Sequence, residues 1–266
     1  MTDTPAAMTY GSYLSLDQLL SAQHPLSANH DEMLFVILHQ TKELWLKQIM
    51  HELDLATGMI RDDHLIEVHK ALSRVTRIQA VMTLSWDVLA TMTPSDYTSF
   101  REVLGASSGF QSAQFREFEY RLGLKDGNHL RFHDEGSAAL AALTHALHRP
   151  SLWDEAIAAA ARAGIDMPPG ALEREWSEPY RADPAVAEGW AEVYRAPEKW
   201  WALYQLAEKL VDLDDALATW RHKHVVTVER IIGLKRGTGG TAGVAYLQST
   251  LGKRAFPELW SLRTLI

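Results

Sequence analysis

The sequence contains no cysteine among its 266 residues. This absence excludes disulfides, thiolate nucleophiles, iron–sulfur clusters, cysteine-type zinc sites and covalent heme attachment through C-x-x-C-H. Any metal chemistry must therefore depend on the 12 histidines and on the carboxylates.

Long apolar runs and basic clusters are also missing. The uninterrupted apolar segments are short, for example 33–38 and 138–143, whereas a membrane-spanning helix needs about 20 such residues. The net charge is −8 with no Lys/Arg run, which argues against nucleic acids and anionic membranes as partners. Because no Lys or Arg precedes Lys42, the N-terminus lacks the basic region of a signal or transit peptide, and we expect a soluble, cytoplasmic protein.

Helical periodicity is the dominant pattern that the sequence does have. Apolar residues recur at three- and four-residue steps over about 30–61, 65–92 and 197–233, with Pro197 expected in the first turn of the last segment and Gly233 at its end. Shorter helices are expected at 94–104, 136–147 and 151–164, and a crossing loop with a short helix at 164–183. We therefore predict an all-α fold with one domain over 1–266, in which residues 1–8 are disordered.

His224 interrupts the apolar stripe of the last long segment, one turn after Trp220 and one turn before Val228. An isolated histidine in such a stripe is more often a hydrogen-bonded core residue than a metal ligand. His222 lies about 200° around the same helix, so both imidazoles cannot face one pocket, which argues against a multi-histidine zinc site.

His39 is the same kind of anomaly on the first long segment. It follows Phe35 by four residues, so the two rings are expected on one helix face. Taken alone, His39 is also more often a hydrogen-bonded core residue than a ligand. Two such histidines on two long helices, in a chain without cysteine, fit opposite faces of one planar cofactor such as heme.

Arg101 follows Tyr97 by four residues, which predicts that both project from one face of a short helix. Its guanidinium could pair with Asp96 or Glu102 at the surface. Alternatively it could hold a substrate carboxylate, for which a planar bidentate donor is suited.

The segment 235–243, K-R-G-T-G-G-T-A-G, matches the loose G-x-G-x-x-G/A pattern of dinucleotide-binding folds. We reject a dinucleotide-binding site here, because a helix rather than a strand is expected before the segment and only 23 residues follow it. The glycines instead predict a mobile loop whose amides, together with the Thr238 hydroxyl, close over an anionic or polar ligand.

Two further groups are weaker candidates. His129 and His133 stand four residues apart and could bind a metal, but their polar surroundings indicate an exposed surface. Tyr10, Tyr13 and Leu14 form an aromatic segment before the first long helix, which packs on its own core or inserts into a neighbouring subunit.

Segments spread over nearly the whole chain, in the same order, resemble the tryptophan 2,3-dioxygenase family. They are 9–14 (TYGSYL), 30–35 (HDEMLF), 39–45 (HQTKELW), 93–97 (TPSDY), 100–101 (FR), 107–112 (SSGFQS), 220–224 (WRHKH) and 233–240 (GLKRGTGG). The resemblance implies an all-α homotetramer with one non-covalent heme b per subunit. It also implies insertion of both atoms of O₂ across the indole C2–C3 bond of L-tryptophan, which gives N-formyl-L-kynurenine in the kynurenine pathway.

The resemblance assigns roles to particular residues of this sequence. His224 would be the axial ligand of the heme iron, and His39 the catalytic residue that accepts a hydrogen bond from the indole N–H. The substrate carboxylate would be held by Arg101, Thr238 and Tyr97. The remaining assignments are Phe35, Trp86 and Ser108 around the pocket, the last two beside the cofactor, and Tyr10, Tyr13 and Leu14 closing the site of an adjacent subunit.

The sequence departs from the family pattern at Lys42, where relatives usually carry Tyr, Ser or Thr, and at His222 and Lys223, where an aromatic residue and an Arg are usual. Two other functions stay open. One is a relative that oxygenates a substituted tryptophan, inserting one oxygen atom, and the other is a heme sensor without turnover.

Overall fold

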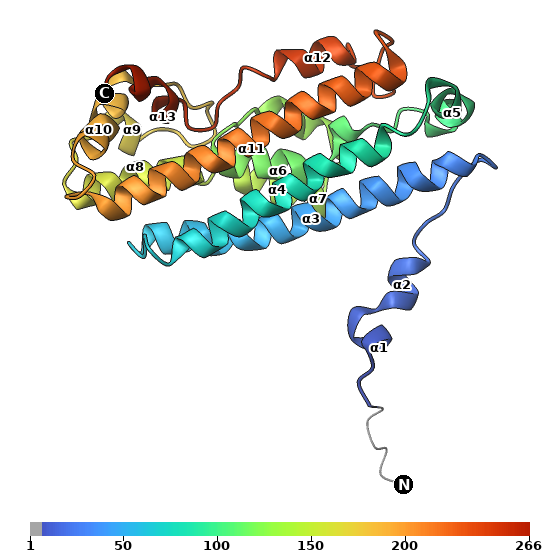
Figure 1. Ribbon diagram of the computed structural model, residues 1–266, viewed down its shortest axis with the longest axis horizontal. Coiled ribbons are helices and arrows are strands. Elements are labelled where there is room, and N and C mark those ends of the chain that lie inside the picture. Colours follow the sequence, from blue (N-terminus) through green and yellow to red (C-terminus); the bar gives the residue numbers. More distant parts are fainter. Residues whose placement is uncertain (1–6) are drawn as a thin grey trace.

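Three long helices lying side by side form the body of the protein (Figure 1). In the computed structural model, which describes residues 7–266, these helices are α3 (His30–Arg61), α4 (Val68–Leu89) and α11 (Trp201–Ile232). A short turn joins α3 to α4, so these two helices are antiparallel, and α11 packs along the other side of α4. No β-strand occurs in the described part of the chain, and the prediction of an all-α fold is confirmed.

The bounds of the long helices follow from local chemistry. The Asn29 side chain accepts the Asp31 amide at 2.9 Å, which caps α3, and the buried Glu32 carboxylate accepts the amides of Leu26 and Ser27. α11 ends at Gly233, which adopts a φ of +60° that favours glycine.

The start of α11 differs from the prediction. The helix begins at Trp201, and Pro197 lies in the turn before it rather than in its first helical turn. The segment 225–228, which carries a brief β-like alternation, is helical because it continues the buried stripe of α11.

A second layer of helices covers one face of α3 (Figure 1). It consists of α6 (Ala113–Leu122), α7 (Ala138–Leu147) and α8 (Leu152–Ala163). Around the N-terminal end of α11 lie α9 (Pro169–Leu172), α10 (Pro184–Arg195), α13 (Pro257–Ser261) and the 3₁₀ turn Leu262–Thr264. At the opposite end lie α5 (Pro94–Phe100), the 3₁₀ turn Arg101–Leu104 and α12 (Val244–Ser249), with further 3₁₀ turns at Gly109–Gln111 and Gly127–Phe132. The sequence predicted α7, α8 and the short α9, but not α6, α10 or α12.

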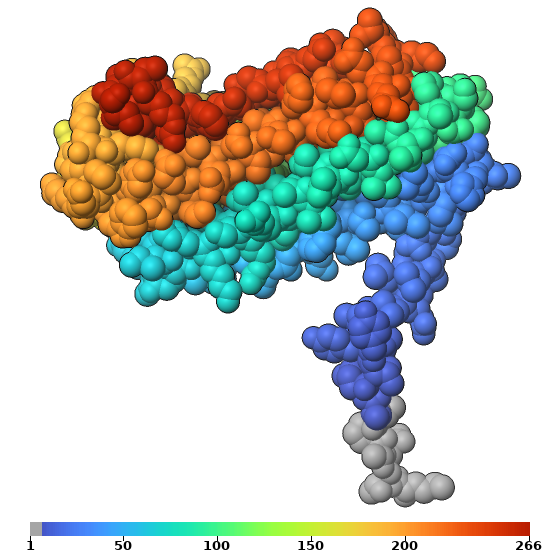
Figure 2. Space-filling view, in the orientation of Figure 1, coloured from blue at the N-terminus to red at the C-terminus, as the bar shows by residue number. Residues whose placement is uncertain are grey.

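The N-terminal segment projects away from this body as an arm (Figures 1 and 2). The arm contains α1 (Tyr10–Leu14) and α2 (Leu16–Leu20). Its apolar side chains contact little of their own chain: Tyr10 is 76% exposed, Tyr13 74% and Leu20 71%. Of the two alternatives for this segment, packing on its own core is therefore excluded, and insertion into a neighbouring subunit stays a prediction. The predicted disorder of residues 1–8 concerns mostly residues that lie outside the described range. Among residues 7–266, no helix combines the length and the apolar character needed to cross a membrane.

Candidate functional site

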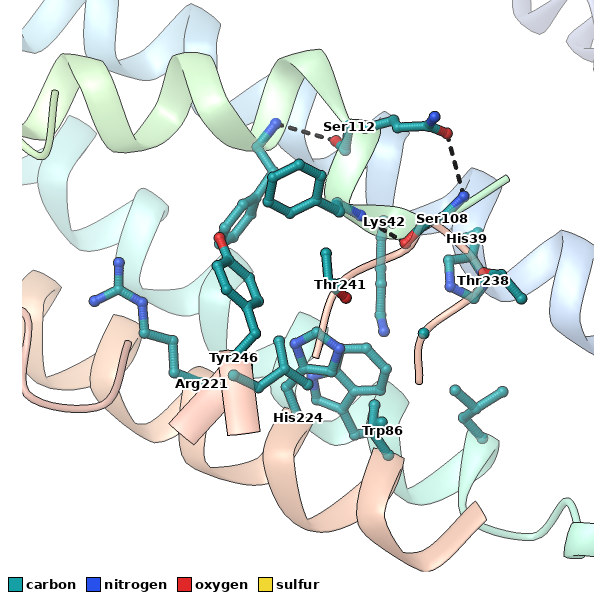
Figure 3. Close-up of a pocket in the computed structure, with 18 of the residues that line it drawn as sticks. His39, Lys42, Trp86, Ser108, Ser112, Arg221, His224, Thr238, Thr241 and Tyr246 are labelled. Atoms are coloured by element: carbon teal, nitrogen blue, oxygen red, sulfur yellow. Dashed lines mark hydrogen bonds between the residues drawn. The ribbon is translucent and has the colours of Figure 1, made fainter. Parts of the chain in front are cut away.

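A cavity of about 490 Å³ lies between the long helices and is covered at one end by the 233–243 loop (Figure 3). Most of its wall is apolar, and its size falls in the ordinary range of small-molecule sites. Seven of the predicted site residues line it: Phe35, His39, Trp86, Tyr97, Ser108, Thr238 and His224. Arg101 and the arm residues Tyr10, Tyr13 and Leu14 do not.

His224 faces the cavity from α11, flanked by indole rings. The Trp86 ring stacks on the imidazole, with centroids 4.3 Å apart and planes 10° apart, and Trp220 lies 5.1 Å away. Burial, with the nearby charge of Lys42 and His39, lowers the pKa of His224 to about 3. The imidazole is therefore neutral at neutral pH and offers a nitrogen lone pair. His222, by contrast, is exposed, as the helix geometry predicts.

His39 faces the cavity from α3 and is fixed in orientation. Its ring lies 4.2 Å from that of Phe35, and its Nδ1 lies 2.7 Å from the Phe35 carbonyl oxygen. Because a carbonyl only accepts, Nδ1 must carry the proton and donate. Burial, followed by the charge of Lys42, lowers the pKa of His39 to about 4, so the ring is neutral and Nε2 is left as an acceptor.

Aromatic rings continue the His39 wall. Tyr97 and Phe100 of α5 lie 6.1 and 5.7 Å from Phe35, and 5.4 Å from each other. α5 is held in place at its start by a capping box, in which Thr93 and Asp96 bond each other's backbone amides, with Pro94 in the first turn.

Lys42 also lines the cavity, one turn after His39 on α3. The residue is only 6% exposed, and its Nζ lies 2.8 Å from the centroid of the Trp86 ring. Within residues 7–266 this Nζ has no hydrogen-bond partner. Burial lowers the pKa of Lys42 to about 6. Lysine at this position was noted in the sequence only as a departure from the family pattern.

A buried ion cluster forms the wall near α6 and α11. The Glu119 carboxylate accepts from both Arg116 and Arg221, the latter at 2.7 Å, and all three side chains are less than a tenth exposed. Burial alone would raise the pKa of Glu119, but the two guanidinium groups outweigh it and hold the pKa below its usual value. The sequence analysis missed this cluster. Its only local signal is the i,i+3 spacing of Arg116 and Glu119, which also occurs on many surface helices.

The 233–243 loop closes over the cavity through contacts with the 101–108 segment. The Thr238 hydroxyl donates to the Ser107 carbonyl at 2.5 Å, and the Arg101 guanidinium donates to the Arg236 carbonyl. Gly239 approaches Ser108 so closely that a Cβ at position 239 would lie 2.6 Å from the Ser108 Cβ. Arg101 is thus held at the loop, at the edge of the site, rather than among the lining residues. It begins the 3₁₀ turn after α5, one turn beyond Tyr97.

The His129 pair does not form a metal site. His129 is buried, 8% exposed, with its ring 5.6 Å from Phe110 and 6.3 Å from Tyr120, so the prediction of an exposed surface is wrong for this residue. Across residues 7–266, no group of three or more His, Asp, Glu or Cys side chains is arranged to hold a metal ion. Polar neighbours in the sequence concealed an aromatic cluster that forms only in the folded chain.

The residues present fit one planar, iron-containing cofactor better than a metal bound by protein groups alone. A single neutral imidazole, His224, can supply an axial ligand, and the apolar wall suits a macrocycle face. The unpartnered Lys42 Nζ gives the same cavity a polar group that calls for an acidic ligand substituent. These features define a class: an all-α protein whose largely apolar cavity brings together two neutral histidines from different long helices.

Comparison with known proteins places the chain within that class. The profile of the tryptophan 2,3-dioxygenase family matches residues 2–149 and 144–266. A tryptophan 2,3-dioxygenase of Caulobacter vibrioides is 64% identical over 97% of this chain and 98% of that protein. Those of Bordetella pertussis and Bacillus thuringiensis subsp. konkukian are 53% and 51% identical, over 97% and 99% of this chain and 90% and 94% of theirs. The chain belongs to the tryptophan 2,3-dioxygenase family.

Proposed function

We propose that the protein oxidises L-tryptophan with O₂, inserting both oxygen atoms across the indole C2–C3 bond to give N-formyl-L-kynurenine. The observation that carries the proposal is that one cavity joins His39 of α3 and His224 of α11, two neutral imidazoles on different helices. Membership of the family supports the same reaction. The reaction would begin tryptophan degradation by the kynurenine pathway, and we place it in the cytoplasm on the sequence evidence given above.

The cofactor in this proposal is a non-covalent heme b. His224 would bind its iron, with Trp86 stacked behind the imidazole and Ser108 on the opposite side of the cavity (Figure 3). When bound as ferrous heme, this group supplies the activation of O₂ that no amino-acid side chain can provide. The protein's own contribution is to bind and orient the amino acid and to exclude water.

His39 is proposed to orient the indole ring. Its Nδ1 is committed to the Phe35 carbonyl, so Nε2 can accept a hydrogen bond from the indole N–H. The rings of Phe35 and Tyr97 would form the wall against which the indole packs. A site built to accept that N–H discriminates against side chains that lack it.

Arg101 and Thr238 are proposed to bind the carboxylate end of the substrate. Both now donate to backbone carbonyls, of Arg236 and Ser107, which join the 233–243 loop to the segment after α5. A bidentate carboxylate is a stronger acceptor for a guanidinium than a single peptide carbonyl. Substrate binding would therefore exchange these contacts and rearrange the loop over the cavity.

The proposed reaction is tested with ¹⁸O₂. The reduced, heme-loaded protein incubated with L-tryptophan should give N-formylkynurenine with two labelled oxygen atoms, measured by product mass. A panel of substituted tryptophans assayed in parallel should show a higher kcat/KM for the unsubstituted amino acid. A product with one labelled atom would instead establish a monooxygenase, and no oxygen-dependent consumption of any indole amino acid would favour a heme sensor.

We further propose that the chain assembles as a homotetramer in which the arm of one subunit completes the site of another. The exposure of Tyr10 and Tyr13 supports this, because large aromatic side chains rarely stay uncovered on an isolated arm. In such an assembly the arm of one subunit would cover the substrate bound in the cavity of another subunit.

Substitutions in the arm should reduce activity without destabilising the protomer fold. Because both side chains are exposed in one chain, the double variant Tyr10→Ala/Tyr13→Ala should lower kcat/KM by about tenfold or more while leaving the secondary structure unchanged. Ile66, 67% exposed at the α3–α4 turn, provides the matched control as Ile66→Ala. Mixed assemblies of this double variant with Arg101→Ala subunits should regain activity if arm and site come from different chains. Absence of any regain would contradict the shared site.

A further inference from the structure

The amino group of Lys42 is the one Lys or Arg side-chain nitrogen in residues 7–266 that is fully buried without a hydrogen-bond partner. Other buried cations in the described chain have oxygen partners: Lys125 donates to the carbonyls of Leu147 and Arg149, and Arg221 donates to Glu119. A buried amino group without a hydrogen-bond partner destabilises the folded chain, because it has lost its bonds to water and gained none in their place. Such a group is expected where a ligand supplies the missing acceptor.

The protein's own carboxylates near the cavity are already engaged. Glu43, next to Lys42 in sequence, accepts from Ser112 and Gln114, and Glu119 accepts from two arginines. Neither carboxylate bonds Lys42. The anion that would satisfy this amine must therefore come with the ligand.

The direction of the Lys42 side chain indicates which ligand this is. Lys42 reaches from α3 across the cavity to the Trp86 ring, and Trp86 is stacked on His224 (Figure 3). Its Nζ thus lies on the His224 side of the cavity. The groups proposed for the substrate carboxylate, Arg101 and Thr238, instead contact the loop at the edge of the cavity.

We propose that Lys42 binds a carboxylate of the planar cofactor, acting as an ammonium anchor for one propionate of the heme. The inference rests on the proposed function, because it needs heme on His224. A carboxylate beside Nζ would also keep the amine protonated, against the burial that lowers its pKa to about 6. In family members with Tyr, Ser or Thr at this position, a neutral hydroxyl would take the place of the ammonium.

The experiment compares heme release from loaded proteins with two cofactors. Hemin and hemin dimethyl ester, in which both carboxylates are blocked, are loaded into the wild type and into Lys42→Met, a variant of similar length without charge. Transfer to excess apo-globin is followed by absorbance. We expect Lys42→Met to release hemin about 10- to 100-fold faster than the wild type, the range of one charge-assisted hydrogen bond. The ester should leave both proteins at equal rates.

Two further variants test whether the effect depends on the charge. Lys42→Arg keeps a cation at this position, so its rate of hemin release should stay within a few-fold of the wild-type rate. Lys47→Met, an exposed lysine on the same helix, should match the wild type with both cofactors. Circular dichroism of each loaded protein checks that the helices are retained.

Several results would overturn the proposal. Equal rates of hemin release from the wild type and Lys42→Met would exclude the anchor. Faster release of both hemin and its ester from Lys42→Met would also exclude it, because such a result would show that the side chain only packs against the cofactor. A low-spin ferric spectrum that is present in the wild type and lost in Lys42→Met would make the amine an iron ligand instead. A raised KM for L-tryptophan with unchanged hemin release would assign Lys42 to the substrate. Failure of every protein, including the wild type, to take up hemin would contradict the proposed function itself.

Discussion

His224→Ala is expected to lose both heme and activity. We propose this imidazole as the iron ligand, in a cavity where no cluster of three metal-binding groups exists within residues 7–266. Its replacement would remove the proposed bond to iron while leaving the apolar walls, so we expect heme occupancy and kcat to fall by about two orders of magnitude or more. Absorbance in the Soret region and turnover of L-tryptophan measure the two effects.

The control for this prediction lies two residues away. His222 is exposed on the opposite face of α11, and His222→Ala should retain occupancy and activity close to those of the wild type. Free imidazole should restore part of the heme spectrum of His224→Ala, because the deleted ring leaves room for it. Full occupancy with an unchanged spectrum in His224→Ala would show that another residue ligates the iron.

Arg101→Ala is expected to lower kcat/KM for L-tryptophan by about two to three orders of magnitude. Removing one partner of a desolvated charge pair leaves the other charge unpaired, which costs about 2–5 kcal/mol. Arg101 lies at the edge of the cavity, so the loss should appear mainly in binding, with heme occupancy unchanged. Steady-state kinetics and the absorption spectrum of the loaded protein separate these effects.

Two comparisons show whether the carboxylate is the group that Arg101 recognises. Tryptamine lacks a carboxylate, so its affinity, measured by spectral titration, should be nearly the same for wild type and Arg101→Ala. Arg101→Lys should recover only part of the loss, because an ammonium cannot form the bidentate contact. An equal loss for tryptamine and L-tryptophan would indicate that Arg101 instead supports the loop through its contact with Arg236.

The long helices were predictable because their apolar residues repeat over about six turns or more, which averages out single exceptions. The predicted runs of about 30–61 and 197–233 correspond to α3 and α11, with bounds that agree to within about four residues. α6 was missed because it spans about three turns with many polar residues, and it buries Arg116 and Glu119 in positions that a sequence pattern assigns to solvent. Burial of these charges depends on Arg221, about one hundred residues later, and no local window contains that information.

In the candidate site, too, some residues were predictable from local sequence patterns and others were not. His39 and His224 were predicted because each places an imidazole in an apolar stripe, and the structure brings both into one cavity. The position of Arg101 depends on the loop that contacts it, and the sequence gives the loop's glycines but not its path. Lys42 could be noticed as an unusual residue, but its unpartnered amine could be recognised only from the folded structure.

The cavity also has a consequence for the order of events during synthesis. Its lining comes from residue 35 on α3 to residue 250 beyond α12, so it draws on almost the whole chain. Chains emerge from the ribosome N-terminus first, and α3 and α4 can form a hairpin long before α11 has been made. Until then the cavity lacks the wall that α11 supplies, including Trp220 and His224. The proposed ligand His224 lies on α11, so we expect the proposed cofactor to be captured only after α11 has been synthesised.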